Sequence, residues 1–164
     1  MQLFLNQKSM MQFELDTEKI FLLLHKYDVE FILVGGLAVN FYGYARSTGD
    51  IDLWIKDNAL NRKKLISSLN EYGVTGIESL IHIPFLAGYS QILLDSGIYL
   101  DLMSSLQHFG QEDFDNAFKN ASDYKLTDNI YIKIISYSEL LFEKTNSTRV
   151  KDNLDAAELN NLNE

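Results

Sequence analysis

The alternation of apolar and polar positions along the chain predicts a mixture of helices and strands. Asp16 and Thr17 are typical of the cap of a helix, which we expect to run to about Tyr27. Residues 31–34 form a short apolar run typical of a buried strand, and residues 37–42 return to helical apolar spacing. The first part of the chain therefore predicts a helix, a strand and a short second helix in succession.

The rest of the chain continues the same mixture. The predicted elements are a strand over 50–56, a helix capped by Asp57 and Asn58 to about Tyr72, a hairpin of 91–94 and 98–104 joined by Asp95-Ser96-Gly97, a helix over 112–121, a turn and strand around Asp128 and Asn129, a helix opened by Ser136, and a last helix over 148–159. Residues 73–84 have poor periodicity and are interpreted as mixed strand and loop. In the last helix, Val150, Leu154 and either Ala156 or Ala157 form the apolar stripe that we expect to be buried.

Length and composition indicate a single domain over residues 1–164, with a core of about 16–135 and C-terminal helices over about 136–160. The net charge of −9 argues against extended duplex DNA binding, which needs a surplus of Lys and Arg. The absence of cysteine excludes disulfides and thiolate metal sites, so a bound metal would have oxygen ligands. No apolar run is long enough to span a membrane and no signal peptide is evident, so we expect a cytoplasmic protein without a membrane partner.

Residues 31–55, FILVGGLAVNFYGYARSTGDIDLWI, combine features that suit a phosphate and a metal ion. Gly35 and Gly36 follow the apolar strand, where they allow a tight turn and bring backbone N–H groups close to a ligand. The start of the following helix would direct its dipole at the same place. Asp50 and Asp52 are two residues apart on a strand, so both carboxylates leave the same face and need a cation between them.

The order of Gly-Gly, a helix and Arg-x-Thr-x-Asp-Ile-Asp resembles the polymerase-beta-like nucleotidyltransferase superfamily, and most closely its small bacterial branch that includes the nucleotidyltransferase toxins of abortive-infection systems. The resemblance covers residues 31–55 closely, and 98–104 and 139–159 more loosely. It implies an α/β (α+β) nucleotidyltransferase fold, in which a mixed sheet is flanked by helices and followed by a short helical C-terminal part. It also implies transfer of a nucleoside monophosphate from an NTP, with Mg²⁺ or Mn²⁺, to RNA or protein in a phage-defence or toxin–antitoxin setting. A cognate antitoxin or toxin would then be a partner.

The resemblance also assigns roles to particular residues. Asp50, Asp52 and Asp101 would be the catalytic metal ligands, and Asp101 would assist deprotonation of the acceptor. Gly35 and Gly36 would hold the triphosphate through their backbone N–H groups. Two structural alternatives remain open at this point. Asp101 could face outward from its strand, and the Asp-x-Asp pair could have only a structural role.

Four further residues are candidates for nucleotide binding. Arg46 and Thr48 are placed to contact phosphate or to orient the Asp-bearing strand, although Arg46 could equally form a structural ion pair. The segment ELLFEKTNSTRVKDNLDAAEL also resembles the branch, and its Lys144 or Lys151 could neutralise triphosphate charge. The competing interpretation is a solvated helix with internal ion pairs.

Other functions remain open as well. One alternative is a small-molecule antibiotic adenylyltransferase with the same core, and another is a non-catalytic nucleotidyltransferase-like binding or antitoxin module. Trp54 shares the parity of Asp50 and Asp52 and could stack on a nucleobase, but a packed tryptophan is the simpler interpretation. The three histidines are scattered and predict no catalytic triad.

Overall fold

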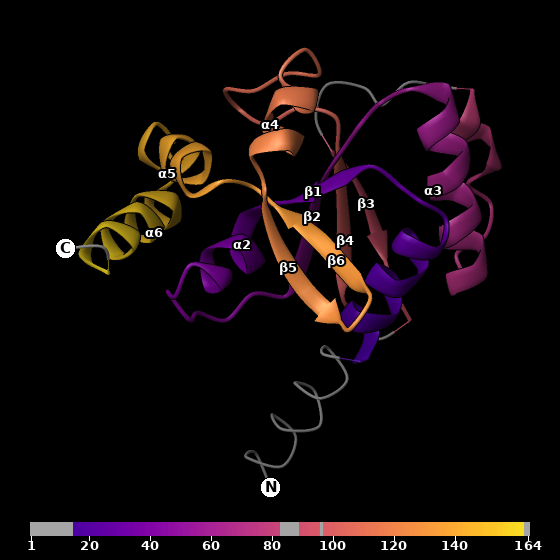
Figure 1. Cartoon of the computed structure of the whole chain (residues 1–164), viewed down its shortest axis with the longest axis horizontal. Coiled ribbons are helices and arrows are strands. Elements are labelled where there is room, and N and C mark those ends of the chain that lie inside the picture. Colours follow the sequence, from indigo (N-terminus) through magenta and orange to yellow (C-terminus); the bar gives the residue numbers. More distant parts are fainter. Residues whose placement is uncertain (1–14, 83–88, 96, 163–164) are drawn as a thin grey trace, which may run out of the picture.

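The structure is a computed structural model that describes residues 15–82, 89–95 and 97–162. A six-stranded mixed sheet has helices on both sides, with α3 on one side and α2, α5 and α6 on the other (Figure 1). The strands are β1 (Phe31–Leu33), β2 (Asp50–Ile55), β3 (Tyr89–Leu93), β4 (Tyr99–Met103), β5 (Ser122–Thr127) and β6 (Ile130–Ile134). The helices are α2 (Gly35–Phe41), α3 (Ala59–Tyr72), α4 (Phe114–Asn120), α5 (Tyr137–Thr145) and α6 (Val150–Asn161), with a 3₁₀ turn η1 (Glu78–Ile81). A further helix covers residues 15–26, and the predicted α/β class is confirmed.

The sheet order is β3-β4-β2-β1-β6-β5. The pairs β2–β4 and β1–β6 are parallel, whereas β1–β2, β3–β4 and β5–β6 are antiparallel. This order makes β2 a central strand between β1 and β4. The two strands that carry the predicted carboxylates are therefore direct neighbours.

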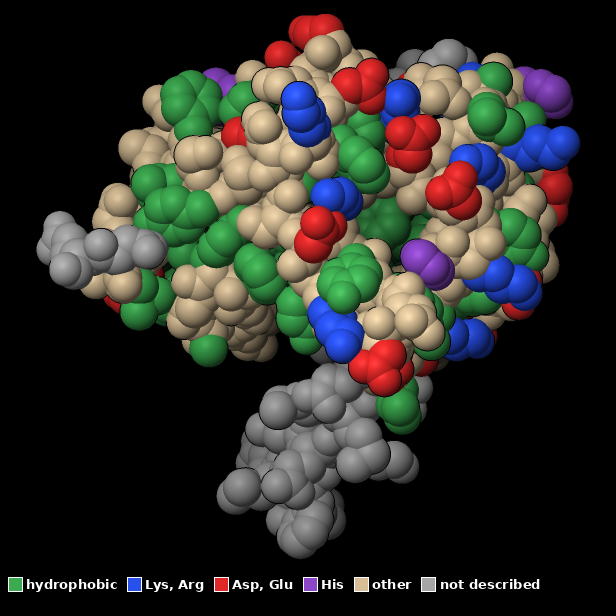
Figure 2. Space-filling view, viewed as in Figure 1, with side chains coloured by type: hydrophobic (Ala, Val, Ile, Leu, Met, Phe, Trp, Pro, Cys, Tyr) green, Lys and Arg blue, Asp and Glu red, His purple; other side chains and the backbone are tan. Residues whose placement is uncertain are grey.

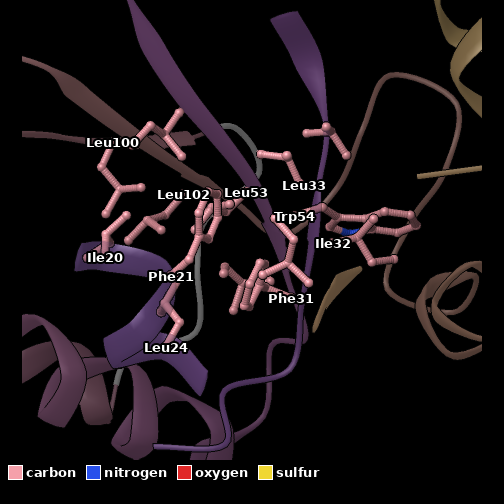
Figure 3. Close-up of a cluster of buried hydrophobic side chains, with 14 of the residues drawn as sticks. Ile20, Phe21, Leu24, Phe31, Ile32, Leu33, Leu53, Trp54, Leu100 and Leu102 are labelled. Atoms are coloured by element: carbon pink, nitrogen blue, oxygen red, sulfur yellow. The ribbon is translucent and has the colours of Figure 1, made fainter. Parts of the chain in front are cut away.

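Alternate residues of β2 face opposite sides of the sheet. Ile51, Leu53 and Ile55 are fully buried on the side covered by the helix of residues 15–26. Figure 3 shows the side chains packed together here, which include Ile20, Phe21 and Leu24 of that helix and Leu53, Leu100 and Leu102 of the sheet. The opposite parity, which carries Asp50 and Asp52, is the side on which α2 and α5 lie.

Several local signals in the sequence produce the expected ends of elements. The Asn58 side chain accepts a hydrogen bond from the Asn61 N–H (2.8 Å) and begins α3. Ser136 accepts one from the Glu139 N–H (3.3 Å) and donates to the Glu139 carboxylate (2.6 Å), so Ser136 caps the beginning of α5 as predicted. The β3–β4 hairpin is confirmed, although Ser96 of its turn lies outside the described residues.

Two predictions need correction in this part of the chain. Residues 73–84 were expected to mix strand and loop, but residues 78–81 form η1, while 83 and 84 lie outside the described residues. The helix expected to begin at residue 112 begins at Phe114, and β5 follows it as a strand that the sequence pattern did not predict. This edge strand has mostly exposed side chains, so it lacks the apolar alternation of a half-buried strand.

The predicted apolar stripe of α6 is wrong for Val150 and Leu154, whereas Ala156, one of the two alanines it offered, is buried. Val150 is 76% exposed and Leu154 is 58% exposed, whereas Asp152 and Asp155 are buried together with Ala156 and Leu159. The helix presents its acidic face to the protein because cationic side chains from other elements pair with that face, as described below. No helix in the described residues is long and apolar enough to cross a membrane.

Candidate functional site

A cavity of about 590 Å³ lies between the sheet and the C-terminal helices, and it is lined by every residue that the sequence assigned to catalysis, metal binding or phosphate binding. Those nine residues come from α2, the loop before β2, β2, β4, α5 and α6, and they are Gly35, Gly36, Arg46, Thr48, Asp50, Asp52, Asp101, Lys144 and Lys151. They span more than a hundred positions of the chain. The fold thus brings the sequence-predicted acids, glycines and cations to one place.

The three acids belong to two adjacent strands. Asp52 on β2 lies directly opposite Asp101 on β4 in the parallel ladder, and Asp50 pairs with Tyr99 two positions earlier. Because residues of one parity share a face, all three carboxylates leave the same side of the sheet. Asp101 therefore faces the cavity, and the alternative of an outward-facing Asp101 is wrong.

The same face is covered farther along β2, at Trp54. The indole is fully buried, packs edge-on against Phe114 of α4 with ring centroids 5.3 Å apart, and donates to the Ser104 carbonyl (3.0 Å). Trp54 is thus a core residue, packed between the sheet and α4 next to the acids on β2. The idea that it stacks on a nucleobase is wrong.

Burial and the charges of neighbouring acids raise the pKa of two of these carboxyls, Asp52 and Asp101. Burial, reinforced by the charges of Asp101 and Asp50, raises the pKa of Asp52 to about 6, although a hydrogen bond from the Gly36 N–H and the charge of Lys144 counteract part of this. Burial and the charge of Asp50 also raise the pKa of Asp101, against a hydrogen bond from Gln91. The nearby positive charge of Lys144 therefore offsets the burial and repulsion of Asp52 only in part.

Gly35 and Gly36 form the first turn of α2, directly against the acids. Gly35 has a φ of +65°, and a Cβ built on it would overlap the carboxylate of Asp52. A Cβ on Gly36 would lie 2.7 Å from Thr48 Oγ1 and 3.2 Å from an Arg46 guanidinium nitrogen. Neighbouring side chains occupy the space that a Cβ would need at Gly35 and at Gly36. Glycine is therefore required at both positions for the backbone to approach these side chains so closely.

A side-chain amide fixes the loop that carries Arg46. Asn40 of α2 donates to the Arg46 carbonyl (2.9 Å) and accepts from the Arg46 N–H (3.0 Å). The Thr48 hydroxyl donates to the Asp50 carbonyl (3.5 Å) at the start of β2. Thr48 thus takes the orienting role that was one of its two predicted roles.

Arg46 forms the structural ion pair that was left open from the sequence. Its Nη2 donates to Asp155 Oδ2 (2.9 Å), and its Nε lies 2.7 Å from Asp155 Oδ1 in a charge contact that lacks hydrogen-bond geometry. Lys144 Nζ lies 2.5 Å from Asp152 Oδ1 and 3.1 Å from Asp155 Oδ2. Both cations line the cavity and are held by acids of α6 at the same time.

Asp152 also interacts with Ser147, whose hydroxyl donates to it (2.7 Å). Burial alone would raise the pKa of Asp152, but hydrogen bonds from Lys144 and Ser147 and the charges of Lys144 and Arg149 hold it below its usual value. Lys151 differs from Lys144, because it is exposed and forms no ion pair within the described ranges. The cavity wall therefore combines neutralised and free cations.

Sequence reasoning missed three residues of this arrangement as site residues. Gln91 of β3 donates to Asp101 Oδ1 (2.8 Å), Asn40 holds the Arg46 loop, and Asp155 pairs with Arg46 across 109 positions. Only Asp155 had a sequence signal, namely its place three residues after Asp152 on one helix face. Nothing local distinguishes Gln91 or Asn40 from other polar residues.

The residues suit a hard divalent cation in their chemistry. The acids supply only oxygen ligands and repel one another, which is the environment that Mg²⁺ or Mn²⁺ would relieve. In the described part of the chain, no three His, Cys, Asp or Glu side chains are grouped closely enough to hold a metal ion by themselves. Asp101 is turned toward Gln91, so an ion here would also need water or substrate oxygens.

Comparison with known proteins adds no relative from which a function could be transferred. Neither a protein-family model nor a curated protein matches the sequence. The arrangement of acids, glycines and cations around the cavity is therefore the basis for inferring a function.

Proposed function

We propose that the protein is a metal-dependent nucleotidyltransferase of the polymerase-beta-like type, which transfers a nucleoside monophosphate from an NTP to RNA or protein. The observation that carries the proposal is the shared cavity of Asp50, Asp52 and Asp101, which adjoins Gly35 and Gly36 on one side and cations of α5 and α6 on another. We assign the chain the nucleotidyltransferase fold on the same basis. A role in phage defence or a toxin–antitoxin pair follows from the sequence resemblance alone.

Asp50, Asp52 and Asp101 would hold Mg²⁺ or Mn²⁺. Such ions, when bound, supply Lewis-acid activation of the attacking hydroxyl and neutralise the triphosphate. The Asp101 carboxyl would accept the hydroxyl proton of the acceptor, and burial together with the charge of Asp50 raises its pKa, which strengthens it as a base. Gln91 hydrogen-bonds Oδ1 and so directs Oδ2 to that task.

The cations of the cavity wall would bind the phosphates. Lys151 and the largely exposed Arg149 line the cavity from the beginning of α6. Arg46 and Lys144 stand deeper and are already neutralised by Asp155 and Asp152. Together with the backbone N–H of Gly35, they offer donors for a polyanion beside the metal-binding acids, whereas the Gly36 N–H already donates to Asp52.

Transfer of label tests the proposal. The protein is incubated with each labelled NTP, Mg²⁺ and total tRNA or cell lysate, and Asp52→Asn is expected to abolish labelling. Asp128→Asn, which changes an exposed acid of the β5–β6 turn, is the control and should label normally. Normal labelling by Asp52→Asn would contradict the proposal.

The position of the label identifies the acceptor class. Label on RNA or on a protein separates the two proposed acceptors, whereas label on an added aminoglycoside would favour the antibiotic adenylyltransferase. NTP binding without label on any acceptor would favour a non-catalytic binding or antitoxin module.

A further inference from the structure

Asp155 is a buried carboxylate that lies behind two cations of the cavity wall. Its side chain is 1% exposed, and it contacts Arg46 through both carboxylate oxygens and Lys144 through Oδ2. Arg46 and Lys144 line the cavity, whereas Asp155 does not. Any influence of Asp155 on a ligand in the cavity therefore acts through these two cations.

The burial of this acid needs an explanation, because α6 could bury Val150 and Leu154 instead and leaves both exposed. A buried ion pair seldom stabilises a fold more than apolar packing of similar volume would. It can, however, fix the geometry of its members. Here the pairing joins α6, α5 and the loop before β2 into one unit around the cavity.

The contacts also orient the two cations. Asp155 engages Nε and Nη2 of Arg46, which leaves Nη1 beside the backbone of Gly36 and bonded only to the Ser47 carbonyl (3.3 Å) within the described structure. Lys144 is close enough to Asp52 that its charge lowers the pKa of that carboxyl. The Nη1 donor of Arg46 thus lies near Gly36, and the charge of Lys144 lies near Asp52.

We propose that Asp155 is a positioning residue that holds Arg46 and Lys144 apart from the metal-binding acids, ready to receive the polyphosphate of the substrate. This inference rests on the proposed function. Without Asp155, Arg46 would be free to turn toward Asp52 and Asp50 and pair with them, and Lys144 would be held by Asp152 alone. Polyphosphate would then lose both a preorganised donor pair and part of its attraction to the site.

The affinity for inorganic tripolyphosphate in Mg²⁺ buffer, measured by calorimetry, tests this role. Simple electrostatics and positioning predict opposite changes in that affinity. Simple electrostatics predicts tighter binding of a polyanion after Asp155→Asn, because the substitution removes a negative charge near the cavity. Positioning predicts weaker binding, by about tenfold or more, as for outer-shell partners that orient a ligand group. Unchanged or tighter binding by Asp155→Asn would overturn the proposal.

Asp57→Asn is the matched control. Asp57 forms an equally buried ion pair with Arg62 (2.6 Å, side chains 7% and 9% exposed), and neither residue lines the cavity. Both substitutions leave a buried Arg with a weakened partner, so a general loss of stability would affect both proteins. Tripolyphosphate affinity is expected to fall only in Asp155→Asn, and an equal fall in Asp57→Asn would overturn the proposal.

A second comparison covers the case in which Asp155→Asn does not fold. Arg46→Gln combined with Asp155→Asn removes both charges of the pair and is compared with Arg46→Gln alone. The double variant is expected to bind tripolyphosphate no more tightly than Arg46→Gln, since Lys144 loses one of its two acidic partners. Tighter binding by the double variant would show that Asp155 acts only as a repulsive charge, which contradicts positioning.

The binding measurement needs no acceptor, so it separates this inference from the proposed function. Weakened binding by Asp155→Asn, together with absence of transfer by the wild-type protein, removes the proposed function alone. Normal transfer together with unchanged binding by Asp155→Asn removes the positioning role alone. Failure of the wild-type protein to bind tripolyphosphate overturns the positioning role as well.

Discussion

Asp52 of β2 and Asp101 of β4 are direct partners in a parallel ladder, so two carboxylates project side by side from the same face of the sheet. Such a pair repels unless a proton or cation lies between its members. Burial and this repulsion raise the pKa of Asp52, whereas burial and the charge of Asp50 raise the pKa of Asp101.

Asp52→Asn should raise the stability of the metal-free protein. The substitution removes a buried charge that Asp101 and Asp50 repel, so the free energy of unfolding at pH 7 in EDTA should hold or rise. A structural Asp would instead lose a hydrogen-bonded partner and cost about 1–3 kcal/mol. Urea melts in EDTA decide between these, and a clear destabilisation would argue against a metal-ligand role for Asp52.

The stability of the metal-free protein should fall with rising pH through the titration of Asp52. Its pKa in the folded state is about 6, above the ordinary value of 3.8, so its contribution is fully present below about pH 4 and is lost as the pH rises through 6. The difference between the two values corresponds to about 3 kcal/mol. The difference in unfolding free energy between wild type and Asp52→Asn should show this pH dependence. A flat difference between pH 4 and 7 would mean that Asp52 titrates normally.

Gly35→Ala should destabilise the fold by more than the cost of its backbone conformation. Gly76 has a similar φ of +79° but open space around it, so Gly76→Ala measures that conformational cost alone, about 1–2 kcal/mol. At Gly35 the new methyl group would also displace the Asp52 carboxylate. Thermal melts of both variants give the comparison, and equal losses would contradict the close approach of Gly35 to Asp52.

Mg²⁺ and an NTP together should raise the melting temperature. A ligand that binds only the folded state stabilises it by about 2.7 kcal/mol at a hundredfold excess over Kd. EDTA should abolish the shift, because the carboxylates alone repel the triphosphate. Scanning calorimetry of wild type beside Asp50→Asn/Asp52→Asn measures this. A shift of the same size in the double variant would show that NTP binding does not depend on these acids.

Leu159→Ala should destabilise the protein much more than Leu154→Ala. Leu159 is fully buried, and truncation of a buried Leu typically costs about 2–5 kcal/mol. Leu154 is 58% exposed, and an exposed substitution typically changes stability by less than about 0.5 kcal/mol. Denaturant unfolding of both variants tests the orientation of α6. The reverse order of losses would restore the apolar stripe predicted from the sequence.

Acidic and basic side chains are interspersed over the face shown in Figure 2. This distribution agrees with the acidic composition, which argued against extended duplex DNA binding. The chemistry suggested by the sequence is concentrated instead in the cavity.

The sequence by itself determined the local elements and the candidate acids. Capping residues such as Asn58 and Ser136 act within one turn, and the parity of Asp50 and Asp52 follows from strand geometry alone, so both could be read without coordinates. The prediction of Asp101 depended on family resemblance, because no local pattern states which strand pairs with β2.

Only the tertiary structure decided which face of α6 is buried and what Arg46 does. Hydrophobic periodicity chose Val150 and Leu154, but the helix buries Asp152 and Asp155 because Lys144 and Arg46 neutralise them from other elements. The partner of Arg46 lies 109 positions away, and its identity depends on how α5 and α6 pack against the sheet. Sequence periodicity assigns apolar side chains to the interior, and it fails where a buried charge has a distant partner of opposite sign.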